Sequence, residues 1–170
     1  MASTTAAPNN SIQAFQPPIK PVLQSCDHDD AFACVAAICN KSLDEIRKVA
    51  IERFGHPKHG PYWIEEELIA KLLAHYSWVA TVYKTSTGIA SLPDLAIGMV
   101  EYNPDTDIGR HVVFQRIPAS GSLKQPIEYV IDPAYWVDPP MRVRTEIKGF
   151  PISFYIGVHP MQKSAAKADK

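Results

Sequence analysis

The sequence lacks the features of several common protein classes. It has three cysteines in 170 residues, an odd and small number that excludes a disulfide framework and predicts free thiols in a reducing compartment. No apolar run approaches the roughly 20 residues that span a bilayer. No N-terminal stretch has the basic, apolar and small-residue order of a signal peptide. We therefore expect a cytoplasmic protein without a membrane partner, with delivery into another cell as an open alternative.

An excess of charge of one sign is also missing. Seventeen basic residues face 18 acidic ones, for a formal net charge of -1, so no basic surface predicts nucleic acid as a partner. Hydrophobic residues make up 46% of the chain, which is the composition of a globular domain and not of a disordered chain. Nothing in the pattern assigns an oligomeric state.

The composition divides the chain into three parts. Residues 1–21 are rich in Ala, Thr, Asn and Pro and poor in large apolar residues, which predicts a mobile N-terminal arm. Residues 161–170 form a short polar tail of the same kind. The folded domain is expected to occupy residues 22–160.

Helical patterns come first in this domain and strand patterns second. Residues 30–39 are small and apolar, with Asp29 or Asp30 as an N-cap, and further helices are expected from the capping box at Ser42 and over residues 64–76. Six later segments read as strands, and they are residues 77–84, 95–102, 110–117, 127–132, 141–147 and 152–158. Helices followed by antiparallel strands predict an α+β fold with segregated layers.

One polar loop and two strand segments carry the chemistry. Gln24 begins a loop that runs directly into the first helix, His111 lies within a strand, and Asp132 ends another strand. Thiol proteases place a nucleophile at a helix N-terminus, a histidine that moves its proton, and an acid that orients the imidazole. A glutamine just before the nucleophile can stabilise the oxyanion.

On these residues the chain resembles a papain-like cysteine peptidase of the bacterial C39-like type. Gln24 stands six positions before Asp30, residues 31–36 fit the family's first helix, His111 fits its histidine strand, and residues 131–133 fit its Asp-Pro strand end. The resemblance covers roughly residues 22–137. It implies a papain-like fold, with a helical layer on an antiparallel sheet and a cleft between the layers.

Asp30 stands where this family has its nucleophilic cysteine. A carboxylate that attacked a peptide carbonyl would form an anhydride, which is uphill from an amide. Three accounts remain open. The chain is a natural pseudoenzyme in which Asp30 pairs with a His111 imidazolium; or Asp30 is an introduced inactivating change; or Cys26 serves as a relocated nucleophile.

The leading functional prediction is a pseudopeptidase that binds a peptide or protein without cutting it, as degenerate C39-like domains do in export machines. The alternative is an active cysteine hydrolase, in which His111 is the general base, Asp132 its orienting acid and Gln24 the oxyanion donor. The third is an unrelated binding domain, which we would infer if Gln24, Asp30, His111 and Asp132 did not converge. No cofactor is expected.

Several other residues have two interpretations. Asp30, His111 and Asp132 also form a possible facial metal-ligand set, although no resident metal is the expectation. Tyr135 and Trp136 follow the Asp-Pro motif, and the resemblance places them at the rim of the cleft. Cys34 and Cys39 lie in the apolar helix, where core packing is the expected role.

Overall fold

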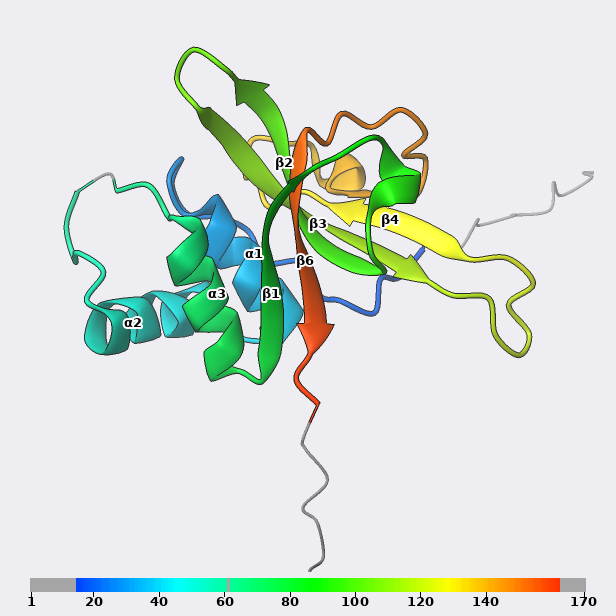
Figure 1. The fold of residues 1–170 in the computed structure, drawn as a ribbon. Helices are drawn as coiled ribbons and strands as arrows, with labels where there is room; N and C mark the ends of the chain where they lie inside the picture. Colours follow the sequence, from blue (N-terminus) through cyan, green and yellow to red (C-terminus); the bar gives the residue numbers. More distant parts are fainter. Residues whose placement is uncertain (1–14, 61, 163–170) are drawn as a thin grey trace, which may run out of the picture.

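The computed structural model describes residues 15–60 and 62–162, which form three helices followed by one sheet (Figure 1). The helices are α1 (Asp30–Cys39), α2 (Leu43–Phe54) and α3 (Glu66–His75), and the strands are β1 (Trp78–Thr85), β2 (Leu95–Asn103), β3 (Ile108–Ile117), β4 (Ile127–Ile131), β5 (Val143–Arg144) and β6 (Phe154–Pro160). Short 3-10 turns occupy Ile89–Ser91 and Pro139–Met141. The predicted α+β class is confirmed.

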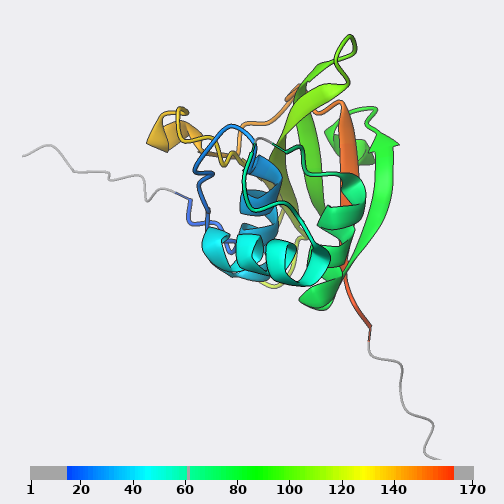
Figure 2. The ribbon, with the colours of Figure 1, turned by 90° about the vertical axis from the view of Figure 1, so that its left-hand side faces the viewer.

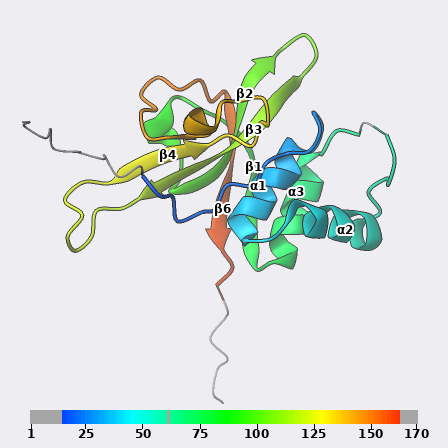
Figure 3. The same ribbon diagram turned by 180° about the vertical axis from the view of Figure 1, so that it is seen from behind.

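The six strands form one antiparallel sheet in the order β1-β6-β2-β3-β4-β5. The last strand of the chain therefore lies between the first two. The three helices cover one face of this sheet, and the β2–β3 hairpin projects beyond them (Figures 1, 2 and 3). This arrangement brings the N-terminus of α1 against β3.

The helix ends follow local sequence signals in one case and depart from them in another. Ser42 caps α2 as predicted, because its hydroxyl accepts a hydrogen bond from the Glu45 amide at 3.1 Å. Asp29 occupies the N-cap position of α1, but no side chain caps this helix. The predicted N-cap position is thus confirmed at Asp29, but its carboxylate binds the Ser25 amide in the preceding loop instead of a helix amide.

Both faces of the sheet are buried. On the helix side, small residues of α1 pack against inward-facing strand residues such as Val113 and Ile131. On the other side, Val112, Phe114 and Val130 form a second cluster with Ile147 and other residues of the chain between β5 and β6. Segment 141–147 was expected to be one strand, but it pairs only at Val143–Arg144 and then leaves the sheet to cover this second face.

The predicted boundary between arm and domain is too late in the chain. Phe15, Ile19 and Val22 are partly buried against the helix-side core. The Phe15 ring centroid lies 5.1 Å from that of Tyr129 on β4. Residues 15–21 are therefore part of the packed domain, because their apolar side chains pack against the helix-side core. The rest of the expected arm (1–14) and most of the expected tail (163–170) lie outside the described residues.

Candidate functional site

Asp30 and His111 form a buried pair that joins α1 to β3. The Asp30 carboxylate lies 2.8 Å from His111 Nδ1 and also accepts a hydrogen bond from the His111 backbone amide. The two residues are 6% and 7% exposed. They lie 81 positions apart in the chain and meet because the first residue of α1 packs over the middle of the sheet. This contact is the one that the sequence pattern predicts.

The surroundings of Asp30 favour its ionised form. Burial by itself raises the pKa of this carboxyl, but hydrogen bonds and charge from His111, with a further bond from the Ala31 amide, outweigh it and lower the pKa below its ordinary value of 3.8. A negative charge at the first residue of a helix also interacts well with the helix dipole. The site therefore holds a buried anion at the first residue of α1.

Tyr83 on β1 completes the site from the other side of the ring. Its hydroxyl lies 2.6 Å from His111 Nε2. Burial, followed by the charge of Asp30, raises the pKa of Tyr83, so the phenol stays protonated. Because a carboxylate only accepts, His111 must carry its proton on Nδ1. Tyr83 then donates to Nε2 when the ring is neutral, or accepts from it when the ring is an imidazolium.

This phenol is the site residue that sequence reasoning missed. Two strands, β6 and β2, lie between β1 and β3 in the sheet order, yet the ring centroids of Tyr83 and His111 are 6.3 Å apart. Nothing in the local sequence of β1 signals this contact, because it depends on how the strands are ordered and assembled in the sheet.

Replacing Tyr83 by Phe is expected to destabilise the fold by about 1 kcal/mol, the net value of a hydrogen bond within a protein. The change also leaves His111 Nε2 without its partner, so the ring nitrogen resonances should move in NMR spectra. Denaturant unfolding and imidazole NMR measure the two effects. Tyr76→Phe is the matched control: its hydroxyl contacts Glu45 at 3.2 Å, away from His111, so its imidazole spectrum should match that of the parent. An unchanged His111 spectrum in Tyr83→Phe would contradict the assigned contact.

Asp132 does not take the orienting place beside His111 that was predicted for it. It is 1% exposed, and its Oδ1 lies 2.6 Å from Arg110 Nη1 and 3.1 Å from the Ala134 amide. Among the described residues, the carboxylate in contact with the His111 ring is that of Asp30. The alternation of strand side chains explains the difference. Val113 pairs with Ile131 on the helix-side face, so Asp132 follows Val130 to the opposite face.

Gln24 lies close to the Asp-Pro segment but its side chain is folded back. Its backbone amide donates to the Pro133 carbonyl at 2.9 Å, which places the predicted glutamine loop beside the predicted acid. The side-chain Nε2 donates to the Cys26 carbonyl at 2.9 Å, and Oε1 is buried without a hydrogen-bond partner. Of the four predicted residues, Asp30 and His111 are in direct side-chain contact. The hydrogen bonds of Gln24 go to Pro133 and Cys26, and those of Asp132 go to Arg110 and Ala134.

Asp29 organises the loop before α1. Its carboxylate accepts hydrogen bonds from the amides of Ser25 at 3.0 Å and Cys26 at 3.2 Å, and it forms an ion pair with Arg47 of α2. These contacts fix the path of the chain from Gln24 to Asp30. Within the acidic run at 27–30, Asp29 is therefore the residue that braces the loop.

The three thiols differ in their surroundings. Cys34 and Cys39 pack in or against the helix-side core, as predicted. Burial raises the pKa of the Cys34 thiol well above its ordinary value and raises that of Cys39 to about 12, so both are poor nucleophiles. Cys26 is exposed and is the accessible thiol of the three.

Exposed aromatic side chains surround the loop before α1. Tyr135 is 48% exposed and donates to Asp27 at 3.0 Å, and Trp136, 51% exposed, packs on its ring. Trp63 is 54% exposed and packs edge-on against His28 at 4.9 Å. The expected cleft-rim role of Tyr135 and Trp136 stays a prediction.

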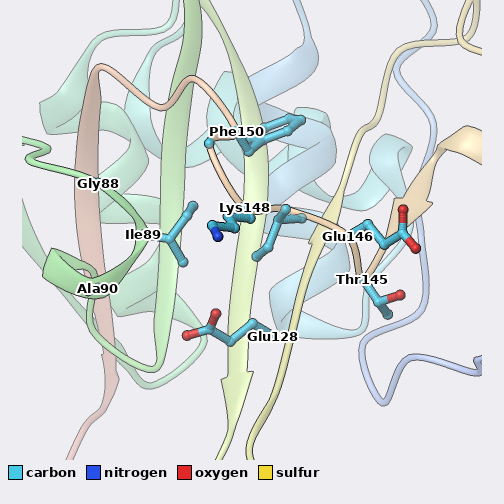
Figure 4. Close-up of a pocket in the computed structure, with 10 residues that line it drawn as sticks. Gly88, Ile89, Ala90, Glu128, Thr145, Glu146, Lys148 and Phe150 are labelled. Atoms are coloured by element: carbon cyan, nitrogen blue, oxygen red, sulfur yellow. The ribbon is translucent and has the colours of Figure 1, made fainter.

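An open cavity of about 1000 Å³ lies elsewhere, between the first 3-10 turn and the chain at 145–150. Figure 4 shows Lys148 and Ile89 beside it, with Glu128 of β4 below. Glu128 is already bound by Arg116 at 2.8 Å, and none of the lining residues belongs to the Asp30–His111 pair.

In the described residues, Asp30, His111 and Asp132 do not gather as a metal-ligand group, because Asp132 faces away. The facial-ligand alternative is therefore not supported.

No protein-family model matches the chain, and no curated protein matches it in sequence. Among the described residues, no helix is long and apolar enough to cross a membrane. Fold and site together define an α+β protein with a buried carboxylate–imidazole–phenol group between its helical layer and its sheet.

Proposed function

We propose that this protein is a papain-like, C39-like pseudopeptidase that binds a peptide or protein and does not cut it. The observation that carries the proposal is the buried contact between Asp30, the first residue of α1, and His111 Nδ1 on β3. This is the geometry of a nucleophile and its base in a thiol peptidase, with a carboxylate in place of the thiolate.

The neighbouring segments support the same class. The glutamine loop and the Asp-Pro strand end lie side by side through the hydrogen bond from Gln24 to Pro133. The helical layer packs on an antiparallel sheet whose strands carry His111 and lead into Asp132. Tyr83 holds the imidazole from the Nε2 side, where the resemblance implies an acid.

Catalysis of peptide hydrolysis does not follow from these residues. The Asp30 carboxylate is nearly closed to solvent and already accepts hydrogen bonds from the ring and backbone amide of His111. Its attack on an amide would produce an anhydride, an uphill product. With Gln24 bound to Cys26, the site also lacks a free side-chain oxyanion donor in this position. Whether Asp30 is native or introduced, the chain as written has no nucleophile here.

A labelling experiment tests the proposal. The parent protein, Asp30→Cys and Asp30→Cys/His111→Ala are treated with a peptidyl ketone electrophile, and digest masses locate the adduct. We expect Asp30→Cys to be labelled at residue 30. The labelling rate should be about 100-fold or more lower in Asp30→Cys/His111→Ala, because a general base typically accelerates a reaction by at least that factor. The parent should be labelled slowly at Cys26, with no dependence on His111.

Two results would overturn the proposal. If residue 30 in Asp30→Cys reacted no faster than Cys26, the site would not activate a thiol and the papain-like assignment would fail. If the parent reacted rapidly at Cys26 and His111→Ala abolished the reaction, the active-hydrolase alternative would replace it. Iodoacetamide serves as a control for thiol exposure, because it needs no peptide recognition.

A further inference from the structure

A second pocket adjoins the Asp30–His111 site through Tyr83. It has a volume of about 210 Å³ and is lined by Tyr83, Met99, Tyr102, Asp107 and Phe154. The Tyr83 phenol that contacts His111 is thus also a wall of this pocket. A group bound here would touch the same side chain that holds the imidazole.

The strand register explains why these side chains meet. Met99 pairs with His111 on one side and with Phe154 on the other, so the three share the helix-side face of the sheet. The pairing of β2 with β3 then shifts between Val100 and Asn103, and Glu101 has a left-handed φ of 54°.

This bulge changes which side chains face the pocket. Glu101 forms an ion pair with Arg110 at 2.8 Å, and Tyr102 turns to the face of Phe154. The two rings lie 4.8 Å apart and edge to face. Without the extra residue, Tyr102 would point to the opposite side of the sheet.

Gly109 on β3 keeps the pocket in shape. A Cβ at this position would lie 2.6 Å from Met99 Cγ and 2.9 Å from the Val100 carbonyl oxygen. The missing side chain therefore lets Met99 lie directly against the backbone of β3. The pocket wall is built by the backbone as well as by the aromatic rings.

The lining is aromatic and apolar, with one charged group. Asp107 is that group, and it accepts a hydrogen bond from the Tyr102 hydroxyl at 2.6 Å. The apolar walls can pack against a chain of methylene groups. The aromatic faces and the carboxylate can bind a cation at the end of that chain, through cation–π attraction and opposite charge. No cationic side chain lines this pocket, so the charge of Asp107 has no basic partner within it.

We propose that this pocket receives the lysine or arginine side chain of a peptide that lies across the Asp30–His111 site, so that the protein selects basic peptides. This inference rests on the proposed function and names its ligand class. The size of the pocket suits one side chain, and charge complementarity selects a cationic one over an apolar one of equal length.

An NMR titration of the isotope-labelled parent protein tests this selection. The probes are the N-acetyl methylamides of lysine, arginine, norleucine and glutamate. We expect saturable shifts at the amides of Tyr102, Asp107 and Gly109 with the two basic probes, with dissociation constants on the order of millimolar for ligands this small. Norleucine should bind about threefold to tenfold more weakly, and glutamate should not bind.

Asp107→Asn is the decisive variant, and Asp105→Asn is its matched control on the same exposed hairpin. Asp107→Asn should weaken binding of the lysine probe about threefold to tenfold, and Asp105→Asn should leave its dissociation constant unchanged. Equal binding of norleucine and lysine, no effect of Asp107→Asn, or no saturable shifts with the basic probes would each overturn the inference. The titration measures ligand binding at the pocket of the parent protein, whereas the labelling experiment measures the reactivity of residue 30. The failure of one proposal can therefore be distinguished from the failure of the other.

Discussion

An Asp30→Ala variant should lose about 2–4 kcal/mol of folding free energy. The substitution removes the acceptor for both the ring and the backbone amide of His111, and these donors lie in a nearly closed space. A buried donor left without a partner has no water to replace the lost bond. Urea unfolding of the variant beside the parent measures the difference.

The control for this variant is Asp105→Ala. Asp105 lies on the exposed β2–β3 turn, and its removal should change the free energy of unfolding by less than about 0.5 kcal/mol. Asp30→Asn keeps the size and one acceptor oxygen, so its cost should fall between the two. A loss of less than about 1 kcal/mol in Asp30→Ala would mean that the carboxylate–imidazole contact contributes little to the fold.

The same contact predicts how stability changes with pH. Because the pKa of Asp30 is lower in the folded protein than its ordinary value of 3.8, the ionised form stabilises the fold above that value. This contribution is lost as pH falls through the folded-state pKa. The difference between the parent and Asp30→Ala should therefore be largest above pH 3.8 and shrink below it. A constant difference across this range would contradict the lowered pKa.

The Phe114→Ala substitution should lower the free energy of unfolding by about 3–5 kcal/mol. Phe114 is fully buried in the cluster on the sheet face opposite the helices, where Arg116 also lies 5.4 Å from its ring centre. Removing the ring leaves a cavity that the surrounding residues, including Ile147 and Val130, fill only in part. Thermal and urea unfolding both measure the loss.

Val82→Ala is the comparison for Phe114→Ala. Val82 lies on the edge strand β1 and is 63% exposed, so the substitution should change stability by about 0.5 kcal/mol or less. If Phe114→Ala cost less than 1 kcal/mol, the segment between β5 and β6 would not form a packed cover, and the sheet would have one buried face instead of two.

Local patterns predicted the helices and most strands well. The small apolar run at 30–39 and the capping box at Ser42 are signals that depend on neighbouring residues, and both helices begin where the signals place them. The strand expected over 141–147 was mostly wrong, since Ile147 is buried by leaving the sheet to cover its second face. The apolar character of a residue predicts that it will be buried, but it does not predict whether a strand or a loop will carry it into the core.

The candidate site was predicted in part for the same reason. Asp30 and His111 come together as the motif spacing indicated. Asp132 was assigned to His111, yet strand alternation sends it to Arg110. Tyr83 was not foreseen, because its contact with His111 crosses two intervening strands. Spacing along the chain carries no information on the order of the strands in the sheet.

The sequence by itself determined the α+β class and the helix that begins at Asp30, because propensity and apolar patterning are local properties. The contact between Asp30 and His111, which lie 81 positions apart, was predicted only through the family resemblance. The tertiary structure decided the rest. The assembled sheet brought Tyr83 of β1 to His111 across two intervening strands, and the bulge at Glu101 turned Tyr102 into the neighbouring pocket. These contacts join residues far apart in the chain, so they exist only once the whole sheet has assembled.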